Sequence, residues 1–190
     1  MGMGRFDESR AHFTRAIEIE PVSPIILSGL ANLYDLQGDY EKEIEQSKKV
    51  LEIDPNFAYA HFYLGMGYER KQMFTEASET LATTMTLFGE PPECAQEVKD
   101  AFTKNGMKGW WQKRLEQIET RPHLKNFQAY YKALVQLRID DREGALKSLN
   151  QAYRQRDRAL AYAKFEQRLD PLRGDPRFQD LVRRMGLNDN

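Results

Sequence analysis

The sequence predicts an all-α fold in which antiparallel helix hairpins stack into a solenoid. The first observation is a period of 34 residues, at which glycines, aromatic residues and prolines recur. The residues that recur at this interval are Gly4 and Gly38; Phe6, Tyr40 and Phe74; Ala16 and Val50; and Pro21 and Pro55. The second observation is that apolar residues return every three or four positions, which is typical of amphipathic helices. A single hairpin of this size cannot bury its own apolar face, so neighbouring repeats must stack.

The clearest hairpin lies between residues 23 and 55. Its first helix is expected to start at Ser23-Pro24, where a capping residue precedes a proline, and to stop at Gly38. Apolar residues at helical spacing mark both helices: Leu27, Leu30, Ala31 and Tyr34 in the first, and Ile44, Val50 and Leu51 in the second. The same register continues into a third copy, which carries Phe74, Ala77 and Leu81.

These residues resemble the tetratricopeptide repeat family, which has this period and carries small and aromatic residues at fixed places. The residues of the third repeat that fit the family pattern are Leu64, Gly65, Tyr68 and Ala77. Two departures are Glu43, at a position where the family has a small residue, and His61, where tryptophan is frequent. They are expected to loosen single packing contacts. The resemblance implies a right-handed superhelical solenoid.

Residues 1–89 are expected to hold the regular repeats. The first is a half repeat, because Gly4 already occupies the turn that follows the first helix in a complete repeat. A solenoid normally ends in a capping element. The missing helix therefore predicts that this chain is the tail of a longer polypeptide.

The period of 34 residues is lost after residue 89. Residues 90–122 are expected to form an irregular helical pair that is interrupted at Asn105-Gly106. Residues 123–190 are expected to form a divergent hairpin of the same type and C-terminal capping helices. In the last of these, Asp175 can cap and Pro176 can open the helix.

Two segments resemble the tetratricopeptide arrays of bacterial regulators. They are residues 169–181, which are similar to the end of such arrays, and residues 101–115, which are similar to the middle. Those proteins carry a winged-helix DNA-binding domain or a protein kinase domain ahead of the array. The resemblance implies that the chain is the arm of a larger bacterial regulatory protein.

Composition indicates a soluble protein of the cytoplasm. Cys94 is the single cysteine, which favours a reducing compartment, and no apolar run is long enough to span a bilayer. The net charge is −1, with −6 on residues 1–89 and +5 on residues 90–190. Trp110-Trp111 and the basic second half could serve nucleic acid, but a pI near 6.3 argues against direct binding.

The sequence offers no catalytic motif. A phosphate-binding loop that ends in Gly-Lys-Ser/Thr and a His-Glu-x-x-His metal motif are both missing from it. His12, His61 and His123 fall in different repeats, so a shared metal is not expected. Cys94 is expected to be a buried, inert thiol. We therefore expect no enzymatic activity, no metal and no cofactor.

In tetratricopeptide arrays the first helices of the hairpins line a concave groove that holds extended peptides or partner helices. The resemblance implies that the partner-binding residues are Asn32, Tyr59, Phe62, Tyr63, Met66, Tyr130 and Tyr131. Packing between helices is an equally good interpretation for Phe62. Family members that grip a terminal carboxylate use lysines, an arginine and asparagines at these places, and only Asn32 fits that set. Apolar anchors of a partner suit the rest.

The leading interpretation is a protein–protein interaction scaffold that binds a partner peptide or helix in this groove. One alternative is a self-association module that forms homodimers or higher oligomers through uncapped helical ends. A further alternative is a small-ligand sensor with a pocket inside the curve of the solenoid. The identity of any partner is not written in the sequence, because one fold hosts many functions.

Overall fold

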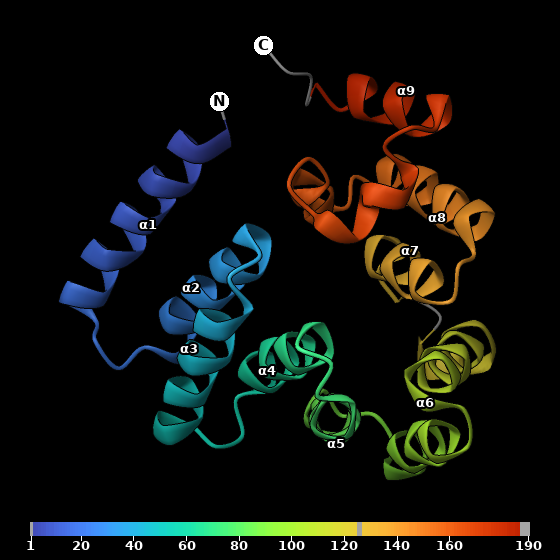
Figure 1. Ribbon diagram of the computed structural model, residues 1–190, viewed down its shortest axis with the longest axis horizontal. Helices are drawn as coiled ribbons and strands as arrows, with labels where there is room; N and C mark the ends of the chain where they lie inside the picture. The colour runs from blue at the N-terminus through green and yellow to red at the C-terminus, as the bar shows by residue number, and fades with distance from the viewer. Residues whose placement is uncertain (1, 125–126, 187–190) are drawn as a thin grey trace. The chain divides into compact units, whose positions relative to one another are not determined.

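The computed structural model describes residues 2–124 and 127–186, with side chains from residue 6 onward, and it is built of helices (Figure 1). Its α-helices are α1 (Gly2–Ile19), α2 (Pro24–Gln37), α3 (Tyr40–Ile53), α4 (Ala58–Arg70), α5 (Phe74–Leu87), α6 (Pro92–Thr120), α7 (Ala129–Arg138), α8 (Arg142–Arg154) and α9 (Pro176–Arg184). Its 3-10 helices are η1 (Pro122–Leu124), η2 (Arg158–Tyr162) and η3 (Gln167–Leu172). No strand occurs among the described residues, and the predicted all-α class is confirmed.

The chain divides into two compact units, Met1–Asp100 and Ala101–Asn190. In the first unit each helix from α1 to α4 packs against the next, and the short turns between them make neighbours antiparallel (Figure 1). Helix α2 also contacts α4, so the first helices of successive repeats are neighbours. This is the packing that stacked hairpins produce.

The signals that predicted the limits of α2 have clear structural counterparts. Pro24 occupies the first turn of the helix, where its missing N–H costs no hydrogen bond. Gly38 ends the helix with a left-handed φ of 75°. Asp39 then caps α3, because its carboxylate accepts a hydrogen bond from the backbone N–H of Lys42 at 3.3 Å.

Small residues allow the helices of the first unit to approach closely. Val50 and Ala60 are fully buried together with Leu27 in a core between α2, α3 and α4. In α4, a Cβ atom added to Gly65 would lie 2.7 Å from Cγ of Leu81 in α5. Only a glycine fits that contact without displacing its neighbour.

The departure at Glu43 is compensated by a second residue. Glu43 is completely buried on α3, and a Cβ atom added to Gly67 of α4 would lie 3.2 Å from its Oε2. The glycine therefore leaves the space that the longer side chain occupies. The larger residue in one helix is matched by a smaller one in the next, so the expected loosening is offset here.

The prediction that Gly4 lies in a turn is wrong. Helix α1 begins at Gly2 and includes Gly4 within its first turns. A single glycine costs a helix only about 1 kcal/mol relative to alanine. The helix therefore continues through this position from Gly2 to Ile19.

In the second unit, helices and 3-10 segments enclose one core. Helix α6 is interrupted as predicted, with Asn105 at φ −138° and Gly106 at φ 61°. The core beyond it gathers apolar side chains from α7, α8, η2, η3 and α9. Its completely buried members are Ala133, Ala145, Leu149, Ala152, Ala163, Leu169 and Leu181.

Carboxylates form ion pairs and hydrogen bonds near the C-terminal end of this unit. Glu166, which is almost fully buried, forms an ion pair with Arg168 and accepts a hydrogen bond from its backbone N–H at 2.9 Å. Asp175 caps α9 as predicted, since its carboxylate accepts from the backbone N–H of Arg177 at 2.8 Å. The Arg177 guanidinium also bridges to Glu143 of α8 at 2.7 Å.

Candidate functional site

The predicted partner-binding residues of the first unit belong to α2 and α4, the neighbouring first helices of two repeats. Asn32 lies half-buried on α2. Tyr59, in the first turn of α4, has 54% of its surface exposed. We call the half-buried or exposed members of this set, Asn32, Tyr59, Phe62 and Tyr63, the α2/α4 face.

Two aromatic rings form the centre of the α2/α4 face. Phe62 and Tyr63 are both half-buried, and their ring centroids lie 5.4 Å apart in an edge-to-face arrangement. Such pairs are rigid and combine an apolar body with the polar tip of a tyrosine. Rings of this kind suit the recognition of an apolar side chain from a partner.

Two of the predicted residues lie in the interior. Met66 on α4 and Tyr130 on α7 are each 1% exposed, so their side chains pack within their own units. Tyr131 is half-buried and packs against the core of the second unit, with its ring 5.5 Å from that of Tyr130. The repeat register indicates on which face of its helix a residue lies. It does not reveal whether other side chains cover that face.

A second surface of the first unit was not predicted from the sequence. Because neighbouring helices are antiparallel, the α1–α2, α3–α4 and α5–α6 turns emerge at one edge of the unit, which we call the turn edge. The large apolar residues exposed there are Ile19, Val22, Ile25, Ile53, Tyr59 and Phe88. The 34-residue spacing from Ile19 to Ile53 was a signal that could have revealed it.

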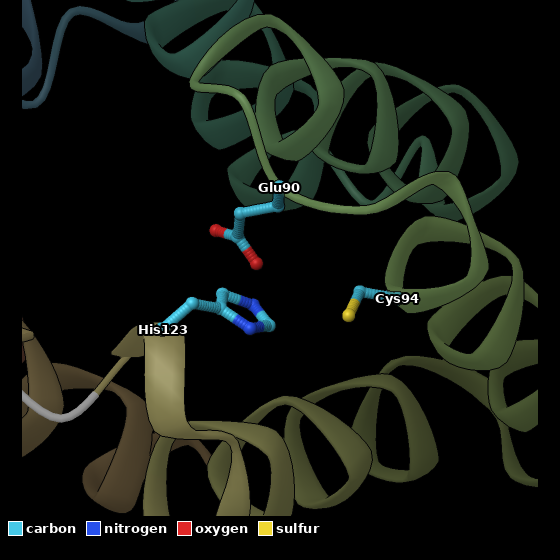
Figure 2. Close-up of side chains that lie close together, drawn as sticks. All are labelled: Glu90, Cys94 and His123. Atoms are coloured by element: carbon cyan, nitrogen blue, oxygen red, sulfur yellow. The ribbon is translucent and has the colours of Figure 1, made fainter.

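The histidines and the thiol that were considered as ligands belong to different elements. His61 Nε2 is 2.9 Å from the carbonyl oxygen of Pro55, to which it can donate a hydrogen bond. Cys94 is buried near the start of α6, and Glu90 precedes it in the α5–α6 turn (Figure 2). His12 is exposed on α1. His123, also drawn in Figure 2, is an exposed residue of η1 in the second unit.

The tryptophans of α6 do not offer an exposed stacking surface. Trp110 and Trp111 are both buried, with ring centroids 4.5 Å apart. The guanidinium of Arg138 lies 4.3 Å from the centre of the Trp111 ring, within the range of a cation–π contact. These rings support the packing of the second unit.

The family of the repeats follows from a comparison with known proteins. Residues 26–57, which run from α2 to the α3–α4 turn, match the family model of the tetratricopeptide repeat. This segment of the chain is a tetratricopeptide repeat. The packing of α2 against both α3 and α4 agrees with this assignment, and the all-α helical-repeat fold predicted from the sequence is confirmed.

Tetratricopeptide repeats generally mediate protein–protein interaction and are typically not catalytic. The tetratricopeptide match lies in the first unit and includes Asn32 of the α2/α4 face. Among the helices that the structure describes, none combines the length and apolar character that a membrane span requires.

Proposed function

We propose that the chain is a protein-interaction scaffold whose α2/α4 face binds a peptide or helix of a partner protein. The observation that carries the proposal is the edge-to-face pair of Phe62 and Tyr63 on α4, a helix that packs against α2, which carries Asn32. Half-buried aromatic rings held by a rigid helix can receive an apolar anchor at low entropic cost. Asn32 supplies an amide that can hydrogen-bond to the backbone of that anchor.

The same proposal includes the larger protein to which the chain would belong. The resemblance of residues 101–115 and 169–181 to the arrays of bacterial regulators supports a role as the arm of such a regulator. In that setting the protein acts in the cytoplasm, catalyses no reaction and contacts no nucleic acid directly. Tyr131 on α7 is a further proposed contact residue, because it is only partly covered by the core of its unit.

The test compares two tyrosines of the same helix. Tyr63 belongs to the α2/α4 face, whereas the ring of Tyr68 faces α3, where Lys48 lies 5.7 Å from its centre. Tyr63→Ala and Tyr68→Ala remove the same side chain from different faces of α4. Each variant and the unmodified chain would be immobilised and used to capture proteins from a lysate of the source organism, followed by mass spectrometry.

We expect a protein that the unmodified chain and Tyr68→Ala retain and that Tyr63→Ala loses. Far-UV circular dichroism must show equal helix content in all three proteins. Equal recovery on both variants would contradict the proposed face. Recovery of the chain alone would favour self-association into homo-oligomers, and light scattering across a concentration series would then have to show a dimer or larger species.

A further inference from the structure

The turn edge carries an apolar ridge that the proposed face does not explain. Ile19 and Ile25 expose 74% and 75% of their surfaces, far more than packed isoleucines do. The ridge repeats with the hairpins, because Ile53 follows Ile19, and Tyr59 follows Ile25, at the interval of 34 residues. Of the described residues, few other large apolar side chains are exposed: Met73, Phe74 and Tyr162.

The ridge continues from one turn to the next. Tyr59, beside the α3–α4 turn, packs edge-to-face on Phe88 of the α5–α6 turn, with 5.3 Å between ring centroids. The ring centroid of Phe57 lies 6.1 Å from that of Tyr59. These contacts join two successive turns into one surface. Contiguous exposed apolar surface of this kind marks interaction sites in soluble proteins.

Acidic residues accompany the apolar ones at every turn. The three segments 16–25, 50–59 and 86–93 contain no lysine or arginine. The acidic residues that they contain are Glu18, Glu20, Glu52, Asp54, Glu90 and Glu93. Basic residues directly precede two of these segments: Arg15 on α1, and Lys49 on α3, whose ammonium group lies 2.7 Å from Glu45. The turn edge is therefore apolar and predominantly negative.

The chemistry of this edge selects among possible occupants. Phosphate groups of a nucleic acid or an acidic lipid surface would be repelled by the carboxylates. A second copy of this chain could offer the positive charge of its second half, but Tyr162 is the large apolar residue that the described part of that unit exposes. That surface has little to match an apolar ridge. A segment that combines basic and apolar side chains satisfies both features.

We propose that the turn edge of the first unit binds a basic, apolar segment of a partner protein. Isoleucine and aromatic residues at the turns receive its apolar side chains, and the flanking carboxylates attract its lysines or arginines. This site is separate from the α2/α4 face except at Tyr59, which borders both. The variants below leave Tyr59 unchanged, so that failure of one proposal is distinguishable from failure of the other.

The probe is a fluorescein-labelled synthetic peptide made of leucine, phenylalanine and lysine, and the readout is fluorescence anisotropy. Two control peptides replace lysine by glutamate, or leucine and phenylalanine by glutamine. We expect the first peptide to bind and each control to bind at least roughly tenfold more weakly, since charge and burial both contribute. Its affinity should fall as salt is raised, because ions screen exposed charges.

Two pairs of variants locate the site. Ile53→Ser at the turn edge is matched by Met73→Ser at the opposite edge, where the exposure is similar at 43% and 38%. Glu20→Lys/Glu52→Lys is matched by Glu8→Lys/Glu76→Lys, which makes the same change of charge at exposed positions away from the turn edge. All four concern exposed side chains, so the fold should persist.

We expect the turn-edge variants to weaken peptide binding by roughly three- to tenfold each, while the matched variants and Tyr63→Ala leave it unchanged. Equal weakening by Glu8→Lys/Glu76→Lys would overturn the proposal, because it would reduce the effect to general attraction by an acidic protein. An absence of peptide binding would overturn it as well. So would self-association that Ile53→Ser abolishes, since a second copy would then be the occupant.

Discussion

Apolar residues are arranged differently in the two units of this protein. In the first unit, small residues such as Gly65 bring helices together, and large side chains such as Ile19 and Ile25 are left exposed at the turns. In the second unit, helices and 3-10 segments enclose Leu149 and Leu169 in one closed core. A repeated hairpin presents a new surface wherever a turn emerges, whereas a closed cluster presents few. Of the large apolar side chains that the structure describes as exposed, all but Tyr162 lie in the first unit.

The largest expected effect breaks a buried ion pair of the second unit. Arg168→Ala leaves the carboxylate of Glu166 buried without its guanidinium, which should lower the free energy of unfolding by about 3–5 kcal/mol. Urea unfolding followed by tryptophan fluorescence measures this, because both tryptophans lie in the second unit. Adding Glu166→Gln should restore part of the loss.

The matched change in the first unit is Lys42→Ala. Its partner Asp39 lies 2.6 Å away, but Lys42 is exposed and Asp39 is only partly buried, so little loss of stability is expected. Circular dichroism measures the free energy of unfolding of both variants. An equal loss in Arg168→Ala and Lys42→Ala would show that burial does not decide how much these ion pairs stabilise the protein. The comparison between the two units would then need a different basis.

A smaller loss of stability should come from filling the space that lets α4 and α5 pack closely. Gly65→Ala places a methyl group against Leu81, and we expect a loss of about 1–3 kcal/mol through overpacking. The control is Gly174→Ala in the second unit, where a Cβ atom meets nothing within 4 Å. Circular dichroism should record the loss for Gly65→Ala, while Gly174→Ala stays near the unmodified protein. Comparable losses would mean that close packing is not particular to the repeats.

The smallest expected effect is a dependence of the second unit on pH. Hydrogen bonds from the Arg177 side chain and backbone lower the pKa of Asp175 to about 2. Burial alone would raise the pKa of Glu166, but the charge and hydrogen bonds of Arg168 outweigh it and hold that pKa below its usual range. A lowered pKa means stability that is complete above the ordinary value of about 4 and is lost as pH falls through the lowered one.

Tm should therefore decrease between about pH 4 and pH 2 when it is followed by tryptophan fluorescence. Asp175→Asn keeps a side-chain oxygen that can cap α9 but removes the charge, so its Tm should change less over the same interval. Parallel curves for the variant and the unmodified protein would exclude Asp175 as a source of the dependence.

The regular part of the fold could be predicted because local signals coincide with the period. Proline at the start of α2 and Gly38 at its end fix that helix without help from distant residues. The 3-10 helices η2 and η3 were not predicted. They depend on caps such as Asp157, which accepts from the N–H of Ala159 at 3.0 Å, and on the core that they close. Such short segments have no hydrophobic period long enough to detect.

The sequence indicated which helix carries each candidate site residue, but it did not indicate whether the side chain of that residue is exposed. The repeat register placed Phe62, Tyr63 and Met66 on the first helix of a hairpin, and that helix is present. Met66 is nevertheless buried, because exposure depends on which neighbouring side chains cover a position. The turn edge was missed for a related reason. Ile19 and Ile53 look like core residues in the sequence, and only the three-dimensional arrangement shows that the described helices leave them exposed.

The coincidence of the exposed ridge with the repeat has a genetic consequence. Because Ile19 and Ile53, like Ile25 and Tyr59, occupy equivalent places in successive repeats, an internal gene duplication of 34 codons would add a helix pair and one further step of the ridge together. The length of the surface and the length of the coding sequence would then grow in the same increments. Lineages that gained or lost a copy could change the reach of this edge without inventing any new residue.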